Sequence, residues 1–250
     1  SSGKKCFIPF ITAGDPDIET TEKIILGMAE EGADIIEIGV PFSDPAADGP
    51  VIMEANIRAL ENGVGINEVF EMLARVSKKC DVALVFLVYA NIVYSNGTEY
   101  FFKRCQECGV SGAIIADVPI EEEHEFRPFA DKYGVELVRL IAPTSTKRIP
   151  AICDGAKGFM YCVSSMGVTG VRENVDEHLA AMFAEINKYC KIPTAIGFGI
   201  SKPEQVKVVK KYTDGVIVGS AIVSIIGEKG RDCVPYVKDY VKSMREALDE

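Results

Sequence analysis

The sequence is poor in histidine and lacks a second pair of closely spaced cysteines. Its only histidines are His124 and His178. Cys105 and Cys108 form one close pair among eight cysteines, whereas a zinc site needs a second pair or histidines at ligand spacing. The scattered cysteines fit buried thiols in a reducing compartment. The sequence therefore predicts no metal site and no redox centre.

Long apolar runs are also missing. The longest have the length of strands, far below the roughly 20 residues of a membrane span, and no signal-peptide pattern is visible. Basic residues are outnumbered, since the net charge is −10 and the pI is near 4.9, which argues against nucleic acid or an anionic membrane as partner. We expect a cytoplasmic enzyme that acts on a small molecule.

Short apolar runs alternate with segments of helical period along the chain. The runs are continuously apolar, as in parallel strands that are covered on both faces. Eight such units in 250 residues predict an α/β fold, a (β/α)8 TIM barrel with residues 1–250 as a single domain. Predicted strands are 6–12, 34–38, 83–88, 112–116, 136–141, 158–163, 194–197 and 215–218, and predicted helices are 20–31, 51–62, 68–79, 99–108, 121–133, 175–189, 203–212 and 234–248.

A doubly wound sheet is the alternative architecture. It usually has a glycine-rich turn after its first strand. Here that turn reads Thr-Ala-Gly-Asp-Pro over residues 12–16 and lacks the dinucleotide fingerprint. Because no linker or low-complexity segment divides the chain either, the barrel is favoured.

A carboxylate stands in the middle of the second predicted strand. Alternation places Ile36 and Ile38 on one face and Glu37 on the other. An unpaired buried carboxylate costs several kcal/mol, and no lysine or arginine lies nearby in the sequence. Either Glu37 turns outward or pairs with a distant cation, or it is an acid/base group.

A second carboxylate, Asp48, follows in the loop after this strand. Loops after the strands of a barrel open on its catalytic face, so the sequence places Glu37 and Asp48 together as an acid/base pair. Asp48 alone, before Gly-Pro, also fits a plain turn. Tyr89-Ala90-Asn91 and Asp117-Val118-Pro119 are predicted as loops on the same face.

Glycine-bearing segments follow the last three predicted strands, at 164–170, 197–201 and 218–221. Barrels commonly bind phosphate there, with the N-terminus of a short helix. Ser220 also reads as an N-cap. We expect a phosphorylated substrate, and we expect residues 163–172 to be a lid or a plain surface loop.

Several blocks of the sequence resemble the tryptophan synthase α subunit family. They are Pro-Phe-Ile-Thr-Ala-Gly-Asp-Pro at 9–16, Glu-Ile-Gly-Val-Pro-Phe-Ser-Asp-Pro at 37–45 with Ala-Asp-Gly-Pro at 47–50, Gly-Val-Thr-Gly at 167–170 and Gly-Phe-Gly-Ile at 197–200. The likeness covers nearly the whole chain, and block 37–50 is highly specific. It implies a (β/α)8 barrel lyase of tryptophan biosynthesis that cleaves indole-3-glycerol phosphate to indole and glyceraldehyde 3-phosphate.

The resemblance also implies roles for single residues. Glu37 would be the acid/base that protonates indole C3 and takes the proton of the glycerol hydroxyl, and Asp48 would hold indole N1–H. Phe10, Leu87, Tyr89, Ile114 and Thr169 would surround the indole, with Tyr161 near the lid and Thr169 bonded to Asp48. Gly170, Gly197, Gly199, Gly219 and Ser220 would hold the phosphate.

The family works as an α2β2 complex, which implies a β subunit as partner. Pro41, Ser43, Asp44 and Pro45, with the helix after the third strand, would face that subunit. The resemblance implies no cofactor in this chain, because pyridoxal phosphate belongs to the β subunit.

Three other readings remain open. A stand-alone indole-3-glycerol phosphate lyase would do the same chemistry without a partner. Another phosphate-binding barrel, a lyase or isomerase, is possible in principle, although an imine-forming aldolase needs a lysine inside a strand and none is present. A non-catalytic, allosteric barrel would not need both Glu37 and Asp48.

Overall fold

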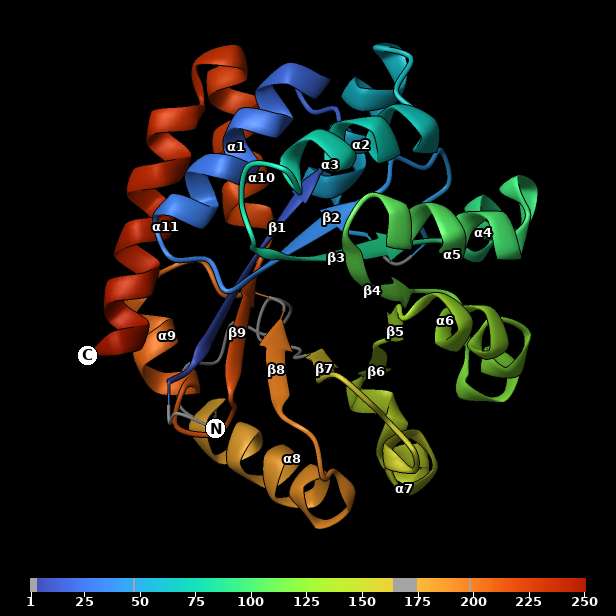
Figure 1. Ribbon diagram of the computed structural model, residues 1–250. Helices are drawn as coiled ribbons and strands as arrows, with labels where there is room; N and C mark the ends of the chain where they lie inside the picture. Colours follow the sequence, from blue (N-terminus) through green and yellow to red (C-terminus); the bar gives the residue numbers. More distant parts are fainter. Residues whose placement is uncertain (1–3, 47, 164–174, 198) are drawn as a thin grey trace.

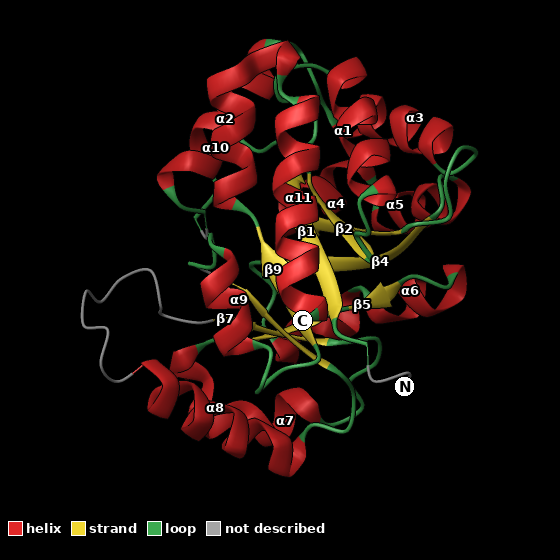
Figure 2. Cartoon of the chain, turned by 90° about the vertical axis from the view of Figure 1, so that its left-hand side faces the viewer, coloured by secondary structure: helices red, strands yellow, loops and turns green. Residues whose placement is uncertain are grey.

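A computed structural model describes residues 4–46, 48–163, 175–197 and 199–250. Its strands form one parallel sheet in the order β5-β4-β3-β2-β1-β9-β8-β7-β6, curled into a barrel with helices outside (Figures 1 and 2). The predicted (β/α)8 fold is confirmed. The strands are β1 (Cys6–Thr12), β2 (Ile35–Gly39), β3 (Ala83–Val88), β4 (Val110–Ile115), β5 (Glu136–Leu137), β6 (Arg139–Ile141), β7 (Met160–Val163), β8 (Thr194–Gly197) and β9 (Gly215–Val218).

The barrel closes at an interrupted strand. The sequence predicts one strand over 136–141, but the structure divides it at Val138 into β5 and β6. The division arises because β5 pairs with β4 while β6 pairs with β7, and the Val138 N–H donates to the Ala113 carbonyl at 3.0 Å. Nine assigned strands therefore occupy eight barrel positions, and each other predicted strand lies within two residues of an observed one.

The helices form a layer around the sheet. The predicted helix over 121–133 is broken: a new helix begins at Arg127, and the ring of Pro128 in its first turn is incompatible with a continuous helix through this point. Two short helices, over 90–96 and 149–153, were not predicted. The helices are α1 (Ile18–Glu30), α2 (Pro50–Glu61), α3 (Ile66–Val76), α4 (Ala90–Asn96), α5 (Thr98–Glu107), η1 (Ile120–Glu125), α6 (Arg127–Tyr133), η2 (Pro143–Arg148), α7 (Ile149–Cys153), α8 (Val175–Tyr189), α9 (Pro203–Val209), α10 (Ser220–Lys229), η4 (Gly230–Asp232) and α11 (Val234–Asp249).

Strand alternation separates two apolar clusters. Ile36 and Ile38 of β2 face outward into the cluster beneath the helices. The barrel interior is filled by a smaller cluster: Ile8, Val85, Ile114, Val138, Tyr161, Ala195 and Ile217. Glu37 is in register with Phe10 of β1 and Val85 of β3, so its side chain points into the barrel, as the alternation predicts.

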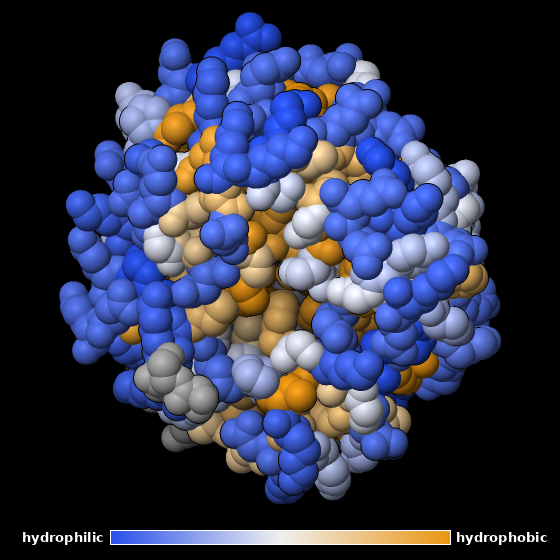
Figure 3. Space-filling model, viewed as in Figure 1, coloured by the Kyte–Doolittle hydropathy of each residue, from blue (hydrophilic) through white to orange (hydrophobic). Residues whose placement is uncertain are grey.

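The barrel is hollowed at the amino ends of its strands. A cavity of about 420 Å³ opens there, lined by residues such as Cys6, Ala83, Gly158 and Pro193. Figure 3, viewed as in Figure 1, shows apolar residues gathered in a hollow over the centre of the barrel. Because these are strand amino ends, this hollow lies opposite the catalytic face of a barrel.

A buried ion pair joins the end of β1 to α2. Asp15 is 1% exposed, and its two carboxylate oxygens accept hydrogen bonds from Arg58 Nε at 2.8 Å and Nη2 at 2.9 Å. This forked geometry is the strong form of the pair. It fixes α2 beside the carboxyl end of β1, where the loops of the barrel meet.

Replacing Arg58 by methionine is expected to lower the free energy of unfolding by roughly 2 kcal/mol, because the Asp15 carboxylate would stay buried without a partner. Urea unfolding measures the change. The double variant Asp15→Asn/Arg58→Met should recover most of the loss, and Arg75→Met, which removes a surface pair with Glu22, should change stability by less than about 1 kcal/mol. Equal losses for Arg58→Met and Arg75→Met would contradict the expectation.

Two further findings concern the described residues. None of their helices is both long and apolar enough to cross a membrane. Cys105 and Cys108 are buried free thiols at the end of α5, and burial raises the pKa of Cys108 to about 11. This thiol therefore stays protonated near neutral pH.

Candidate active site

A cavity of about 530 Å³ opens at the carboxyl ends of the strands. Its walls come from β1, β2 and β3 on one side and from the segments after β8 and β9 on the other. Its volume suits a small organic substrate. The lining residues are Phe10, Glu37, Asp48, Gly49, Ile52, Leu87, Ala116, Leu140, Ala142, Tyr161, Val163, Gly199, Ile200, Ser201, Ile217, Gly219, Ser220 and Ala221.

Glu37 lies in the wall of this cavity and is 1% exposed. Neither carboxylate oxygen has a hydrogen-bond partner among the described residues. Burial, with a contribution from the charge of Asp48, raises the pKa of Glu37 to about 8. The group is therefore mostly protonated at neutral pH and is set up to donate a proton. The alternative in which Glu37 turns outward is wrong.

Asp48 faces the same cavity from the loop between β2 and α2. Its Oδ2 accepts a hydrogen bond from Asn56 Nδ2 at 3.2 Å. Burial raises the pKa of Asp48, whereas hydrogen bonds from Asn56 and Tyr89 oppose that rise. Donors aimed at a carboxylate favour its charged form. The two carboxyl groups thus differ in environment, since Asp48 has donors and Glu37 has none.

Tyr161 lies beside both carboxyl groups. It is buried in the barrel interior and lines the cavity. Burial and the charges of Glu37 and Asp48 raise its pKa well above the usual value, so the phenol stays neutral.

The opposite end of the cavity consists of backbone and small side chains. Gly199, with φ of +74°, lies after β8. Gly219 precedes α10, whose first residues Ser220 and Ala221 also line the cavity. The first N–H groups of a helix have no partner within the helix and attract anions. Ser220 is the first helical residue rather than the N-cap, because Gly219 takes that position.

Three predicted site residues do not line the cavity. Ile114 is buried in the barrel interior, below the floor of the cavity. The residue of this segment that lines the cavity is Ala116, two positions further along the chain. Tyr89 lies behind Asp48 and stacks on Phe42 with ring centroids 4.9 Å apart. Gly197 backs Tyr161, because a Cβ at this glycine would lie 2.7 Å from the Tyr161 hydroxyl.

Thr169 and Gly170, with most of the predicted lid, lie outside the described residues. The cavity is lined by five of the other predicted site residues: Phe10, Leu87, Gly199, Gly219 and Ser220. In the predicted interface loop Ser43 and Asp44 are exposed, whereas Pro41 and Pro45 are buried.

Sequence reasoning missed several residues around the site. Four apolar residues also line the cavity, and nothing in the sequence distinguishes them from other core residues: Ile52, Leu140, Val163 and Ile217. Asn56 was missed as well. Its signal was available, because an amide stands between Ala55 and Ala59 on the buried face of α2.

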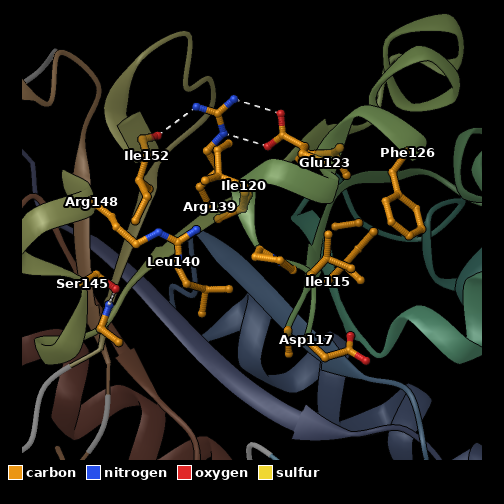
Figure 4. A pocket seen from close by; sticks show the side chains of 17 residues that line it. Ile115, Asp117, Ile120, Glu123, Phe126, Arg139, Leu140, Ser145, Arg148 and Ile152 are labelled. Carbon is orange, nitrogen blue, oxygen red and sulfur yellow. Dashed lines mark hydrogen bonds and ion pairs between the residues drawn. The ribbon is translucent and has the colours of Figure 1, made fainter. Parts of the chain in front are cut away.

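A third cavity, of about 480 Å³, lies between the barrel wall and the η1–α6 and η2–α7 segments (Figure 4). Arg139 forms a forked pair with Glu123, with Nε–Oε2 at 2.7 Å and Nη2–Oε1 at 2.8 Å, and Asp117 lies away from this pair. Burial alone would raise the pKa of Glu123, but hydrogen bonds from Arg139 and Arg127 hold it below the usual value. Because these charges are already paired, the catalytic candidates remain Glu37 and Asp48.

Comparison with known proteins gives one consistent result. The family model of the tryptophan synthase alpha chain matches residues 1–249. The tryptophan synthase alpha chains of Thermoanaerobacter sp. (strain X514) and Lacticaseibacillus casei are each 46% identical, over 248 and 245 residues, covering 98% of this chain and 95% and 92% of theirs.

Solved structures agree with the sequence matches. The Legionella pneumophila str. Paris tryptophan synthase subunit alpha has a TM-score of 0.91 at 33% identity, covering 98% of this chain and 93% of its own. A chain of the tryptophan synthase a2b2 complex from Pyrococcus furiosus has a TM-score of 0.90 at 37% identity, covering 96% and 98%.

Proposed function

The chain belongs to the tryptophan synthase alpha chain family, and from this premise we propose that it cleaves indole-3-glycerol phosphate to indole and glyceraldehyde 3-phosphate. One observation supports this most. An unpartnered, buried Glu37 and a hydrogen-bonded Asp48 line a single cavity. The opposite end of that cavity is a helix N-terminus suited to phosphate.

Glu37 is the proposed acid and base. Its raised pKa, about 8, leaves a proton on the carboxyl group for transfer to indole C3. This breaks the aromaticity of the five-membered ring and weakens the bond from C3 to the glycerol chain. The Glu37 carboxylate then accepts the proton of the neighbouring glycerol hydroxyl as the C–C bond breaks. The aldehyde leaves, the indole regains aromaticity, and Glu37 ends protonated, as it began.

Asp48 is the proposed partner of indole N1–H. Protonation at C3 places positive charge on the ring nitrogen, and a carboxylate at N1 stabilises it. Burial raises the pKa of Asp48, and the hydrogen bonds from Asn56 and Tyr89 act against that rise and so favour the charged form that this role needs. These proton transfers need only side chains of this chain, so we propose no cofactor here and assign pyridoxal phosphate to the β subunit.

The phosphate is proposed to lie against Gly199, Gly219 and Ser220. Glycine suits position 219, since a Cβ there would lie 3.2 Å from the Phe10 ring. Anchoring the phosphate on this side orients the indole ring towards Glu37 and Asp48. Residues 1–250 are proposed to act as one domain, and the location to be cytoplasmic.

A tryptophan synthase β subunit is the proposed partner, as in the Pyrococcus furiosus a2b2 complex. Ser43 and Asp44 are exposed in the loop after β2, and Tyr94 of α4 is 47% exposed after β3. Stacking of Phe42 on Tyr89 holds these neighbouring segments together. We propose that these exposed residues contact the β subunit.

Indole release from indole-3-glycerol phosphate tests both proposals. We expect slow release by the chain alone and a rise on the order of ten-fold or more with saturating cognate β subunit, a typical coupling between sites. Fast release that the β subunit leaves unchanged would favour a stand-alone lyase. No release under either condition, from folded protein, would reject this substrate in favour of another phosphate-binding barrel.

A further inference from the structure

A buried amide stands behind the candidate catalytic carboxylate. Asn56 is 4% exposed and shares the buried face of α2 with Ala55 and Ala59. Burying an amide is unfavourable unless its donors and acceptor are all used. An alanine would complete this face without that penalty, so the contacts of the Asn56 amide indicate what it does.

Three hydrogen bonds hold the Asn56 side chain. Its Nδ2 donates to Asp48 Oδ2 at 3.2 Å and to the Ile52 carbonyl at 3.1 Å. Its Oδ1 accepts the Phe42 N–H at 3.2 Å. The reverse orientation of the amide would set oxygen against a carboxylate and NH2 against an N–H, so the partners themselves fix the orientation.

These contacts close into a ring. Asn56 joins Phe42, at the start of the loop after β2, to Asp48, near the end of that loop. The Phe42 ring stacks on Tyr89 at an interplanar angle of 23°, and the Tyr89 side chain hydrogen-bonds Asp48. The loop between Phe42 and Asp48 displays Ser43 and Asp44 to solvent. The exposed loop is thereby joined to Asp48 in two ways, by the Asn56 amide and by the Phe42–Tyr89 stack.

We propose that Asn56 is the positioning residue of this site: it aims Asp48 at the indole nitrogen and links the Asp48 carboxylate to the loop that faces the β subunit. This role deepens the proposed lyase function and rests on it. Asn56 does not line the cavity, so it acts only through Asp48.

Replacing Asn56 by alanine is the first test. We expect kcat for indole release to fall by about 10²-fold, the loss typical when a reacting group is misplaced by about 1 Å, with a smaller change in KM. Asp48 also loses a donor, so the acid limb of the kcat/KM profile should move to higher pH by about one unit. The groups that face Asp48 are Glu37, Tyr161 and Tyr89, and none is altered.

Asn62→Ala is the matched control, because it removes an amide from the end of the same helix, where Nδ2 donates to the exposed Pro16 carbonyl. It should leave kcat and the pH profile unchanged. If Asn56→Ala behaves like Asn62→Ala, the proposal is wrong.

Two further variants separate positioning from general packing. In an Asp48→Asn background, adding Asn56→Ala should lower kcat by less than about three-fold, because the carboxylate it serves is gone. Asn56→Asp keeps an acceptor for Phe42 but donates to Asp48 only while it holds a proton. Its activity relative to the wild type should rise as the pH falls. The positioning role of Asn56 would be contradicted if the two single losses in kcat multiplied in the double variant. It would also be contradicted if the defect of Asn56→Asp did not depend on pH.

An NMR titration of the Asp48 carboxyl carbon keeps this inference apart from the lyase proposal. A higher pKa of Asp48 in Asn56→Ala than in the wild type supports the positioning contact whether or not indole-3-glycerol phosphate is the substrate. An unchanged pKa overturns it even in an active enzyme. Absence of indole release by the wild type would reject the lyase function alone.

Discussion

Replacing Glu37 by glutamine is expected to abolish indole release, with kcat reduced by about 10³-fold or more, because the amide can neither protonate C3 nor accept the hydroxyl proton. KM should change little, since glutamine has the size of the protonated acid. Glu136→Gln is the matched control: one of its oxygens is also buried without a partner, but it lines the hollow at the amino ends of the strands. If kcat of Glu37→Gln for indole release stayed within ten-fold of the wild-type value, Glu37 could not be the acid/base of the reaction.

The same substitution should stabilise the fold. The pKa of Glu37 is about 8 in the folded chain against 4.5 for an ordinary, solvated glutamate. Between these values the folded chain holds a proton that the unfolded chain releases, so the free energy of unfolding falls as pH rises from about 4.5 to about 8. Glutamine removes this dependence. Glu37→Gln should match the wild type below pH 4.5 and exceed it by roughly 3 kcal/mol at pH 7, as urea unfolding would measure.

Replacing Asp48 by asparagine is expected to lower kcat by about 10² to 10³-fold, because a neutral amide no longer stabilises positive charge at the indole nitrogen. Asparagine keeps the shape of the side chain, and the phosphate end is untouched, so KM should stay within about three-fold. Steady-state kinetics of the isolated chain would separate these effects.

Asp44→Asn serves as the control for Asp48→Asn, because Asp44 lies in the same loop but is exposed. Without β subunit it should be as active as the wild type. A large rise in KM with an unchanged kcat for Asp48→Asn would mean that Asp48 only binds the ground state.

The parts of the fold that follow from local patterns were predictable. Continuous apolar runs located the strands, and alternation placed Glu37 inside the barrel. The helix predicted over 51–62 was found over 50–61, with Pro50 in its first turn, where proline is well tolerated. Each of these depends on residues close together in the sequence.

The misses depend on contacts between distant segments. α4 begins at Ala90 where a loop was expected, because the Asp117 side chain accepts the Ala90 N–H at 2.8 Å from the end of the next strand. Ile114 lies below the cavity because strand register, not residue type, sets its depth. The amide of Asn56 stands out in the sequence on an otherwise apolar helix face, but its partners Phe42 and Asp48 follow only from the structure. A single sequence contains no direct signal of such pairings.

The interrupted strand has a consequence for how the barrel opens. β4 and β5 share only two register pairs, as do β8 and β9, whereas β2 and β3 share five. Unlike the β8–β9 pair, the β4–β5 stretch has a cavity rather than packed side chains outside it. Local opening begins where backbone hydrogen bonds and apolar contacts are fewest. We therefore expect the barrel to open transiently between β4 and β5, along residues 112 to 138. The Glu123–Arg139 ion pair, outside this stretch, restrains the opening. Glu37 and Asp48 lie on the continuous side, so amide exchange at the weak wall can proceed while the two carboxyl groups keep their spacing.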